Sequence, residues 1–164
     1  MLSRRWLLTG GAVGLAALAA QRVFRPGTPR ADETFPVIHS EAEWQKRLTP
    51  DQYAVLREEK TERPFTSPLL DEHRKGIFAC AGCDLDLFSS EAKFDSGTGW
   101  PSFWKPLEKA VGETSDTSFF MTRTAVHCSQ CGGHLGHVFD DGPQPTGLRY
   151  CMNGVALTFK AATA

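Results

Sequence analysis

The chain has 164 residues, and its 18 Lys and Arg against 19 Asp and Glu leave a formal net charge of −1. Hydrophobic residues make up 41% and charged residues 23%, an ordinary globular usage that excludes a disordered or fibrous protein. The length suits one domain with a leader or a tail. The charge balance lacks the basic excess of nucleic-acid-binding proteins, so we expect no nucleic-acid partner.

Residues 1–20 are predicted to be an export signal. Arg4 and Arg5 precede an uncharged run from Trp6 to Gln21, which is short for a membrane span of about 20 apolar residues. Ala17-Leu18-Ala19 fits a small-x-small cleavage site. The paired arginines resemble the twin-arginine signal of bacterial export, with an ordinary signal or an uncleaved anchor as alternatives. We therefore expect a periplasmic protein, attached to a membrane only through an uncleaved leader.

A linker and two short helices are predicted next. Residues 21–37 hold three prolines and little apolar content, which predicts a linker before a domain spanning 38–164. Ser40-Glu41-Ala42-Glu43 is a capping box that opens one helix. Thr49-Pro50-Asp51-Gln52 repeats the device with proline at the first helical position, and this second helix is expected to continue to about Lys60.

Short strands follow, because helical periodicity disappears from Glu62 onward. Runs that alternate, or that carry β-branched and aromatic residues, stand between Gly, Pro and Asp clusters at Gly76–Cys80, Leu85–Ser89, Phe119–His127 and Val155–Phe159. Val155, Leu157 and Phe159 are expected to share one strand face. The domain is therefore predicted to be mainly β, with two short helices followed by small antiparallel sheets.

Two C-x-x-C pairs carry the strongest chemical signal. Cys80 and Cys83, like Cys128 and Cys131, are separated by two small or polar residues and follow a predicted strand. Such knuckles hold zinc tetrahedrally through four thiolates at about 2.3 Å, which leaves no position open for catalysis. We therefore expect one structural zinc ion per chain.

The alternative for these four cysteines is disulfide bonding, which an exported protein allows. Two matching knuckles favour the metal, and a disulfide within one C-x-x-C would be strained and reducible. Loading with zinc and folding before twin-arginine export would also leave no free knuckle thiols for periplasmic oxidants.

The fifth cysteine, Cys151, is left over from any complete pairing. If its run is extended, Arg149, Cys151 and Asn153 point to one face. A thiol beside a guanidinium is biased toward the nucleophilic thiolate. The alternative is an inert buried thiol.

Two histidines and an aromatic loop are further candidates. His134 and His137 follow the second knuckle directly. Because four cysteines already fill a zinc shell, these histidines suit acid–base or hydrogen-bonding work near a reacting group, with a core or surface position as the alternative. The Gly-rich and aromatic run Ser96–Trp104 is either a packed turn or an aromatic wall for a small apolar group.

Together these residues resemble the methionine-R-sulfoxide reductase B family, the peptide-methionine (R)-S-oxide reductases. Seven segments carry the resemblance in one order: Glu62–Thr66, Cys80–Cys83, Ser96–Phe103, Cys131–Phe139, Asp141–Pro143, Pro145–Leu148 and Arg149–Cys151. The match runs from about Ser40 to Phe159. The resemblance implies a fold of two antiparallel sheets with helices at the N-terminal side, and a four-cysteine zinc site.

The resemblance also implies the active site and the reaction. Cys151 would be the nucleophile, with neighbours Trp100, His134, His137, Asn153 and, nearby, Arg149. The R epimer of methionine sulfoxide in oxidised proteins would be reduced through a sulfenic acid on Cys151, which a thioredoxin-like thiol reductant restores. Two positions depart from the family: Thr98 replaces the resolving cysteine of many members, and Met152-Asn153-Gly154-Val155 stands where Ile-Asn-Ser-Ala is usual.

Two other functional classes fit parts of the sequence. A zinc-ribbon binding module would need no thiol chemistry and would make Cys151 incidental. A thiol–disulfide oxidoreductase would use one C-x-x-C pair, but four metal-bound thiolates cannot cycle. Zinc content tests the second alternative, and a single-turnover assay with methionine-R-sulfoxide tests the first.

Overall fold

The structure is a computed structural model, and it describes residues 34–117 and 122–163. The predicted export signal and most of the predicted linker lie outside the described residues, as does Phe119 at the start of one predicted strand. Within the described part of the chain, no helix is long and apolar enough to cross a membrane.

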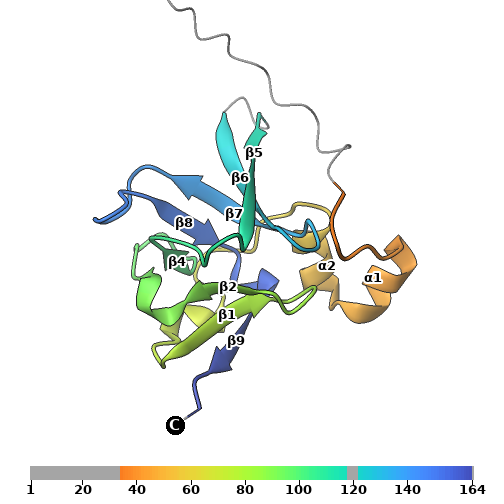
Figure 1. Cartoon of the computed structure of the whole chain (residues 1–164), viewed down its shortest axis with the longest axis horizontal. Coiled ribbons are helices and arrows are strands. Elements are labelled where there is room, and N and C mark those ends of the chain that lie inside the picture. The colour runs from red at the N-terminus through yellow and green to blue at the C-terminus, as the bar shows by residue number, and fades with distance from the viewer. Residues whose placement is uncertain (1–33, 118–121, 164) are drawn as a thin grey trace, which may run out of the picture.

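Two antiparallel sheets form the body of the domain, and two short helices lie at one side (Figure 1). The smaller sheet has the strand order β2-β1-β9 and the larger one β3-β4-β8-β7-β6-β5. The strands are β1 (Gly76–Cys80), β2 (Asp86–Ser89), β3 (Lys93–Phe94), β4 (Ser102–Phe103), β5 (Val111–Asp116), β6 (Arg123–Cys128), β7 (His134–Phe139), β8 (Arg149–Met152) and β9 (Leu157–Ala161). The predicted fold class is confirmed.

Both helices begin where their capping boxes predict. In α1 (Glu41–Arg47) and α2 (Pro50–Leu56), the N-cap side chain accepts a backbone hydrogen bond while the third helical residue bonds back to the N-cap. The prediction that the second helix continues to about Lys60 is wrong. Glu59 adopts a left-handed φ of 58°, and the Lys60 N–H donates to the Ala54 carbonyl at 3.0 Å, a closure that ends helices.

The strand predictions are confirmed unevenly. The strand β1 has the predicted bounds, whereas β6 begins at Arg123 and extends to Cys128. Val155 was expected to share a strand face with Leu157, and this is wrong because Val155 lies in a 3-10 helix, Gly154–Ala156. The Glu62 carboxylate accepts hydrogen bonds from the Gly154 and Val155 N–H groups, and this holds the chain in a turn before β9.

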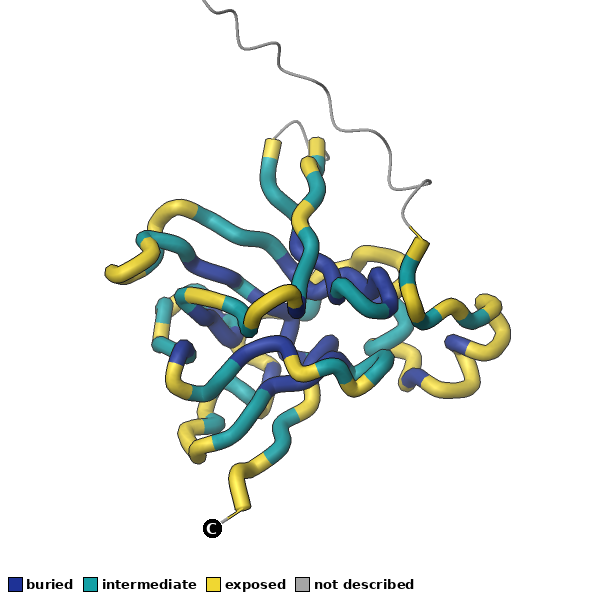
Figure 2. Tube along the Cα trace, in the orientation of Figure 1, coloured by how far each residue is buried: buried dark blue, intermediate teal, exposed yellow. Residues whose placement is uncertain are grey.

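Aromatic side chains from both sheets meet in the core. Phe78 of β1 and Phe88 of β2 pack on Phe103 of β4, with ring centroids 5.0 and 4.4 Å from that of Phe103. All three rings are fully buried, and each contributes about 1.5–3 kcal/mol by leaving water. Figure 2 shows the buried segments concentrated in the middle of the molecule, along strands of both sheets. One face of the large sheet therefore packs against the hydrophobic core.

Candidate functional site

The opposite face of the large sheet carries Cys151. Its neighbour Tyr150 pairs with Phe103 and lies near Phe88 on the core side, and successive residues of a strand alternate between faces. Cys151 has His137 of β7 and Ser102 of β4 as its ladder partners. Directly opposite residues of an antiparallel pair point to the same face. The register therefore places His137 beside Cys151.

A second pair of residues lies on this face one step along the strands. Arg149 of β8 pairs with Phe139 of β7, two residues from Cys151 and His137 respectively. The Arg149 guanidinium stacks over the Phe139 ring at 4.4 Å and donates two hydrogen bonds of 2.8 Å to the Asp141 carboxylate. The pKa of Arg149 is raised, first by the hydrogen bond to Asp141 and also by the charge of Cys151. The guanidinium thus faces both Asp141 and the thiol.

Cys151 opens onto a small cavity of about 120 Å³, lined by Thr61, Trp100, Arg123, Phe139, Cys151 and Asn153. The Trp100 indole N–H donates to the Glu62 carbonyl at 2.9 Å, and this fixes the ring as one wall. A larger cavity of about 370 Å³ shares Trp100 but not Cys151. The smaller cavity is the candidate site because it alone of these two contains the nucleophilic group.

Asn153 lies just beyond the end of β8 and is buried. Its side-chain amide donates to the Leu135 carbonyl at 3.0 Å, and its side-chain oxygen accepts from the Glu62 N–H at 2.8 Å. These hydrogen bonds connect Asn153, which lines the cavity, to β7 and to Glu62, whose carbonyl positions Trp100.

The two predicted histidines are brought together on β7. Their ring centroids are 5.4 Å apart in an edge-on arrangement, and the His134 residue is 3% exposed. The His137 Nε2 lies 2.8 Å from a carboxylate oxygen of Asp116, at the end of β5. That oxygen also accepts a 2.7 Å hydrogen bond from Arg123 of β6. Asp116 therefore links His137 to an arginine that lines the cavity.

Sequence reasoning missed several of these neighbours, namely Thr61, Asp116, Arg123 and Phe139. Asp116 and Arg123 are ladder partners across a hairpin, and charged residues near a hairpin tip usually lie in solvent. Phe139 belongs to one of the segments that carry the family resemblance, but the sequence predicted no role for it. Thr98 was noticed for the cysteine that it replaces, yet its Oγ1 lies 3.7 Å from the Cys151 Sγ.

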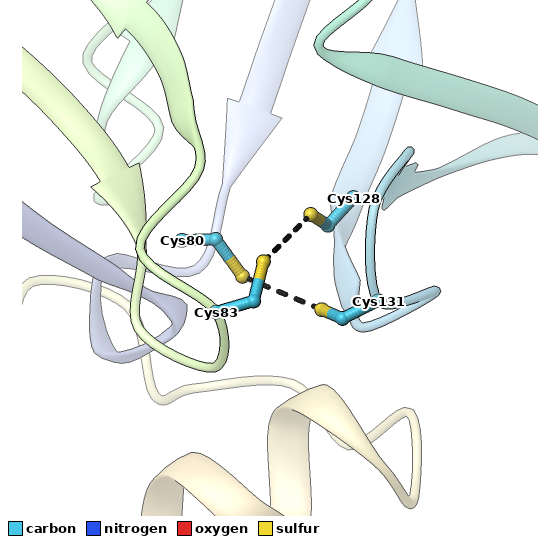
Figure 3. A group of neighbouring side chains, drawn as sticks. All are labelled: Cys80, Cys83, Cys128 and Cys131. Atoms are coloured by element: carbon cyan, nitrogen blue, oxygen red, sulfur yellow. Dashed lines mark hydrogen bonds between the residues drawn. The ribbon is translucent and has the colours of Figure 1, made fainter. Parts of the chain in front are cut away.

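The four knuckle cysteines form one cluster (Figure 3). Their Sγ atoms all lie within 4.8 Å of one another, with 3.7 Å between Cys80 and Cys131 and 3.5 Å between Cys83 and Cys128. A tetrahedron of thiolates at about 2.3 Å from a zinc ion has sulfur–sulfur edges of about 3.8 Å. Disulfide sulfurs would be about 2.05 Å apart. The cluster fits a four-coordinate metal ion, and its thiols are free.

Crowding of the four thiols makes a cation at this cluster physically reasonable. The pKa of Cys128 is lowered by hydrogen bonds from the other three, that of Cys131 first. The pKa of Cys80 is raised, first by its hydrogen bond to Cys128 and further by burial. One thiolate therefore opposes the ionisation of its neighbours, and a dication would remove that opposition.

Residues before α1 and after α2 contact the second knuckle of the cluster and the strand that leads into it. Arg57, directly after α2, donates to the Cys131 carbonyl at 2.9 Å. The Val37 N–H donates to the Gln130 carbonyl at 2.9 Å, and the Phe35 ring packs edge-on to His127. The end of the predicted linker thus lies on the second knuckle, while the boundaries 21–37 and 38–164 stay predictions.

Comparison with known proteins identifies similar chains. The SelR domain family matches residues 48–161. Peptide methionine sulfoxide reductase MsrB of Agrobacterium fabrum is 52% identical over 132 residues, which cover 79% of this chain and 98% of that protein. The proteins of the same name from Methanosarcina barkeri and Bradyrhizobium diazoefficiens are 57% and 59% identical, over 76% and 74% of this chain and 88% of each relative. The matched region contains both cysteine knuckles and Cys151.

Proposed function

The chain belongs to the SelR domain family and is a peptide methionine sulfoxide reductase of the MsrB type, and we propose that it reduces the R epimer of methionine sulfoxide in proteins through a sulfenic acid on Cys151. The family resemblance predicted from the sequence is confirmed. The observation that carries the mechanism is the place of Cys151, at a cavity walled by Trp100 and beside the Arg149 guanidinium.

The cavity suits the end of a methionine sulfoxide side chain. The Trp100 and Phe139 rings offer apolar surface to the S-methyl group, while Arg123 and Asn153 offer polar groups to the sulfoxide oxygen. The sulfoxide sulfur is stereogenic, so methyl group, oxygen and side chain must each meet their own part of the site. This requirement favours one epimer, in keeping with separate enzymes for the two.

Cys151 supplies the electrons. Its thiolate attacks the sulfoxide sulfur and an S–S bond forms. The oxygen then passes to the Cys151 sulfur, forming an S–O bond there, while the bond from the methionine sulfur to oxygen and the S–S bond both break. The methionine sulfur gains two electrons and the cysteine sulfur loses two. A thiol and a sulfoxide thus become a sulfenic acid and a thioether, and the atoms balance. The positive Arg149 guanidinium favours the anionic form of the nucleophile.

The proton that the sulfoxide oxygen needs would come from His137, the ladder partner of Cys151 on β7. The Asp116 carboxylate only accepts hydrogen bonds when ionised, so the hydrogen at His137 lies on Nε2. That leaves Nδ1 as the ring atom that exchanges a proton with the substrate or with a water molecule. His134, packed edge-on against His137, limits the movement of its ring.

Recycling needs an external reductant. The other four cysteines form the cluster that could hold a metal ion, and Thr98 cannot form a disulfide with Cys151. Two thiol equivalents, from a thioredoxin-like protein, would return the sulfenic acid to a thiol and release water and a disulfide. After one stoichiometric turnover we expect one adduct with a sulfenic-acid reagent and no new intramolecular disulfide by intact mass.

Zinc is the proposed metal of the cluster, held by Cys80, Cys83, Cys128 and Cys131. Four soft thiolates in a tetrahedron suit zinc and fill its shell, so the ion contributes stability rather than chemistry. The knuckle Cys128–Cys131 directly precedes β7, which carries His134 and His137. Metal binding therefore supports the catalytic strand from its beginning.

Export to the periplasm is a further part of the proposal. It rests on Arg4 and Arg5 before the uncharged run to Gln21, the pattern of a twin-arginine leader. The substrates would then be oxidised envelope proteins. Cell fractionation and N-terminal sequencing of the mature protein test this part independently of the enzyme assay.

The decisive experiment for the function is epimer-resolved reduction with a chemical dithiol. Peptides carrying only the R or only the S sulfoxide are incubated with the protein, and the methionine formed is measured. We expect turnover of the R peptide and none of the S peptide. Turnover of the S peptide at an equal rate would contradict the stereochemical proposal, and turnover by a Cys151→Ser variant would contradict the mechanism.

The same measurements separate the two other functional classes. A binding module would reduce neither peptide, and membership of a reductase family already argues against it. A thiol–disulfide oxidoreductase would need a free C-x-x-C pair, whereas both pairs meet in one cluster.

A further inference from the structure

We infer that Thr98 is a further catalytic residue, which donates a hydrogen bond to the thiolate of Cys151 from the end of a chain of three hydroxyl groups. The inference rests on the proposed role of Cys151 as the nucleophile. It gives Thr98 a positive function, beyond the absence of a resolving cysteine at that position.

The hydroxyl chain consists of Ser102, Ser96 and Thr98. Ser102 Oγ lies 3.1 Å from the Trp100 carbonyl oxygen and 2.7 Å from Ser96 Oγ. Ser96 Oγ lies 2.8 Å from Thr98 Oγ1, which lies 3.7 Å from Cys151 Sγ. Ser102 is fully buried and is also the ladder partner of Cys151. The hydroxyl chain therefore begins on β4, beside Cys151, and ends at the Cys151 sulfur, with its other members in the 96–101 loop.

Counting hydrogens gives this hydroxyl chain two orientations. Each hydroxyl has one hydrogen to donate and can also accept. When Cys151 is a thiol, its S–H donates to Thr98, and each hydroxyl donates to the next until Ser102 donates to the Trp100 carbonyl. Every hydrogen is then used, and the terminal carbonyl is the only group that merely accepts.

Loss of the thiol proton reverses the direction of donation. Thr98 then donates to the sulfur anion, Ser96 donates to Thr98, and Ser102 donates to Ser96. Only hydroxyl rotations are needed, because the three contacts between Ser102, Ser96, Thr98 and Cys151 serve both orientations. The hydrogen bond from Ser102 to the Trp100 carbonyl is the one contact that is given up. A donor to an anion forms a stronger bond than one between neutral groups, and donors in a chain polarise one another. The hydroxyl chain thus stabilises the reactive form of Cys151.

The charged and titratable groups of the site lie on the other elements and are unchanged by substitutions in this loop. Arg149 approaches from β8 and His137 from β7, while Arg123 and Asp116 come from β6 and β5. The hydroxyl chain is the contribution from the side of β4. A variant at Thr98 therefore isolates that side.

The experiment measures alkylation of Cys151 by iodoacetamide in the metal-loaded full chain, with Cys151→Ser as the blank for the other thiols. Thr98→Val keeps the branched shape and removes the hydroxyl. We expect its alkylation rate at neutral pH to fall about tenfold, because one hydrogen bond to a charged group is lost. The plateau rate at high pH, where the thiol is ionised in every variant, should not change.

Two further variants separate the hydrogen bond from the shape of the loop. Thr98→Ser restores a hydroxyl and should recover most of the lost rate. Thr158→Val, at an exposed position of β9, makes the same change far from the site and should match the wild type. Reduction of the R sulfoxide should fall with alkylation in Thr98→Val, mainly through kcat.

Equal alkylation by Thr98→Val and the wild type across the pH range would overturn the inference. If Thr98→Val loses its cooperative melting transition, Ser96→Ala replaces it, because it breaks the hydroxyl chain one step from the sulfur. We then expect a loss of about threefold, and an unchanged rate would overturn the inference. Alkylation needs no sulfoxide, so a wild-type protein without reductase activity would refute the proposed function instead.

Discussion

The five cysteines of this protein occupy two regions built on opposite principles. The cluster of knuckle cysteines gathers four identical thiols from two short loops and is closed, with Cys80, Cys128 and Cys131 buried. The candidate active site holds a single thiol at an open cavity, surrounded by side chains of different chemistry from several strands. In the first region, residues close together in the sequence supply the thiols. In the second region, the register of the strands determines which side chains surround Cys151.

This difference predicts different responses to substitution. A closed cluster of ligands contributes binding free energy to folding, so damage there should appear as lost stability. An open site depends on geometry within fractions of an ångström, so damage there should appear as lost rate with the fold intact.

Removal of the reacting thiol should give the largest separation of the two effects. Cys151→Ser should abolish sulfoxide reduction, because a serine hydroxyl ionises far less readily than a thiol. Metal content and melting temperature should equal those of the wild type. Metal analysis, calorimetry and the peptide assay measure these three quantities, and any retained turnover would refute the assignment.

Removal of one ligand should produce the reverse pattern. Cys128→Ser should lose the metal and several kcal/mol of unfolding free energy, a fall in melting temperature of about 10 °C or more. Activity should disappear with the folded fraction. If the untouched protein contains no zinc and mass spectrometry shows two disulfides, the metal site is wrong.

A glycine pair compares the tolerance of the two regions to one methyl group. A Cβ at Gly136 would lie 2.2 Å from the Cys151 carbonyl oxygen, so Gly136→Ala must push β7 away from β8. We expect kcat/KM to fall about a hundredfold, as misplacement by about 1 Å does. Gly82→Ala is the matched control inside the first knuckle, where the nearest atoms are 3.6 Å away. This variant should keep both metal and activity, and equal losses in the two variants would contradict the register argument.

Asp116→Asn probes the support of His137. The asparagine amide can donate where the carboxylate could only accept, so it permits the wrong histidine tautomer. We expect kcat to fall about tenfold with KM nearly unchanged, within the range typical of acid–base catalysis. Asp86→Asn, on β2 and paired with Lys160, is the control for loss of one carboxylate. A rise in KM with kcat unchanged would indicate a role of Asp116 in substrate binding instead.

Asp141 should show the smallest effect, because its side chain is 59% exposed. Its pKa is lowered by the hydrogen bond from Arg149, so its contribution to stability is present above the unfolded carboxyl pKa of about 3.9 and is lost as the pH falls through the lower folded value. Asp141→Asn should cost less than about 1 kcal/mol at neutral pH and nothing in acid below both values. Urea unfolding at the two pH values measures the difference.

The local parts of this molecule were readable from the sequence. Both capping boxes predicted where α1 and α2 begin, since a cap needs only residues three positions apart. The spacing of Cys80 and Cys83, repeated at Cys128 and Cys131, predicted one cluster. The end of α2 and the beginning of β9 were misplaced. Glu59 in a left-handed conformation ends the helix, and the distant Glu62 carboxylate holds the chain in a turn before the strand.

The surroundings of Cys151 were decided by tertiary structure. The sequence alone determined the family, the nucleophile candidate and the cluster, because each is written in short motifs. Burial of Phe78, Phe88 and Phe103 fixes the register of the antiparallel strands. That register then determines which residues lie next to the thiol. Thr98 and Asp116 stand 53 and 35 positions before it. The sequence marked Thr98 only as a replaced cysteine, and nothing local marks Asp116. Hydrogen bonds and side-chain contacts act over a few ångströms of space, so only the packed sheet could bring these groups to the site.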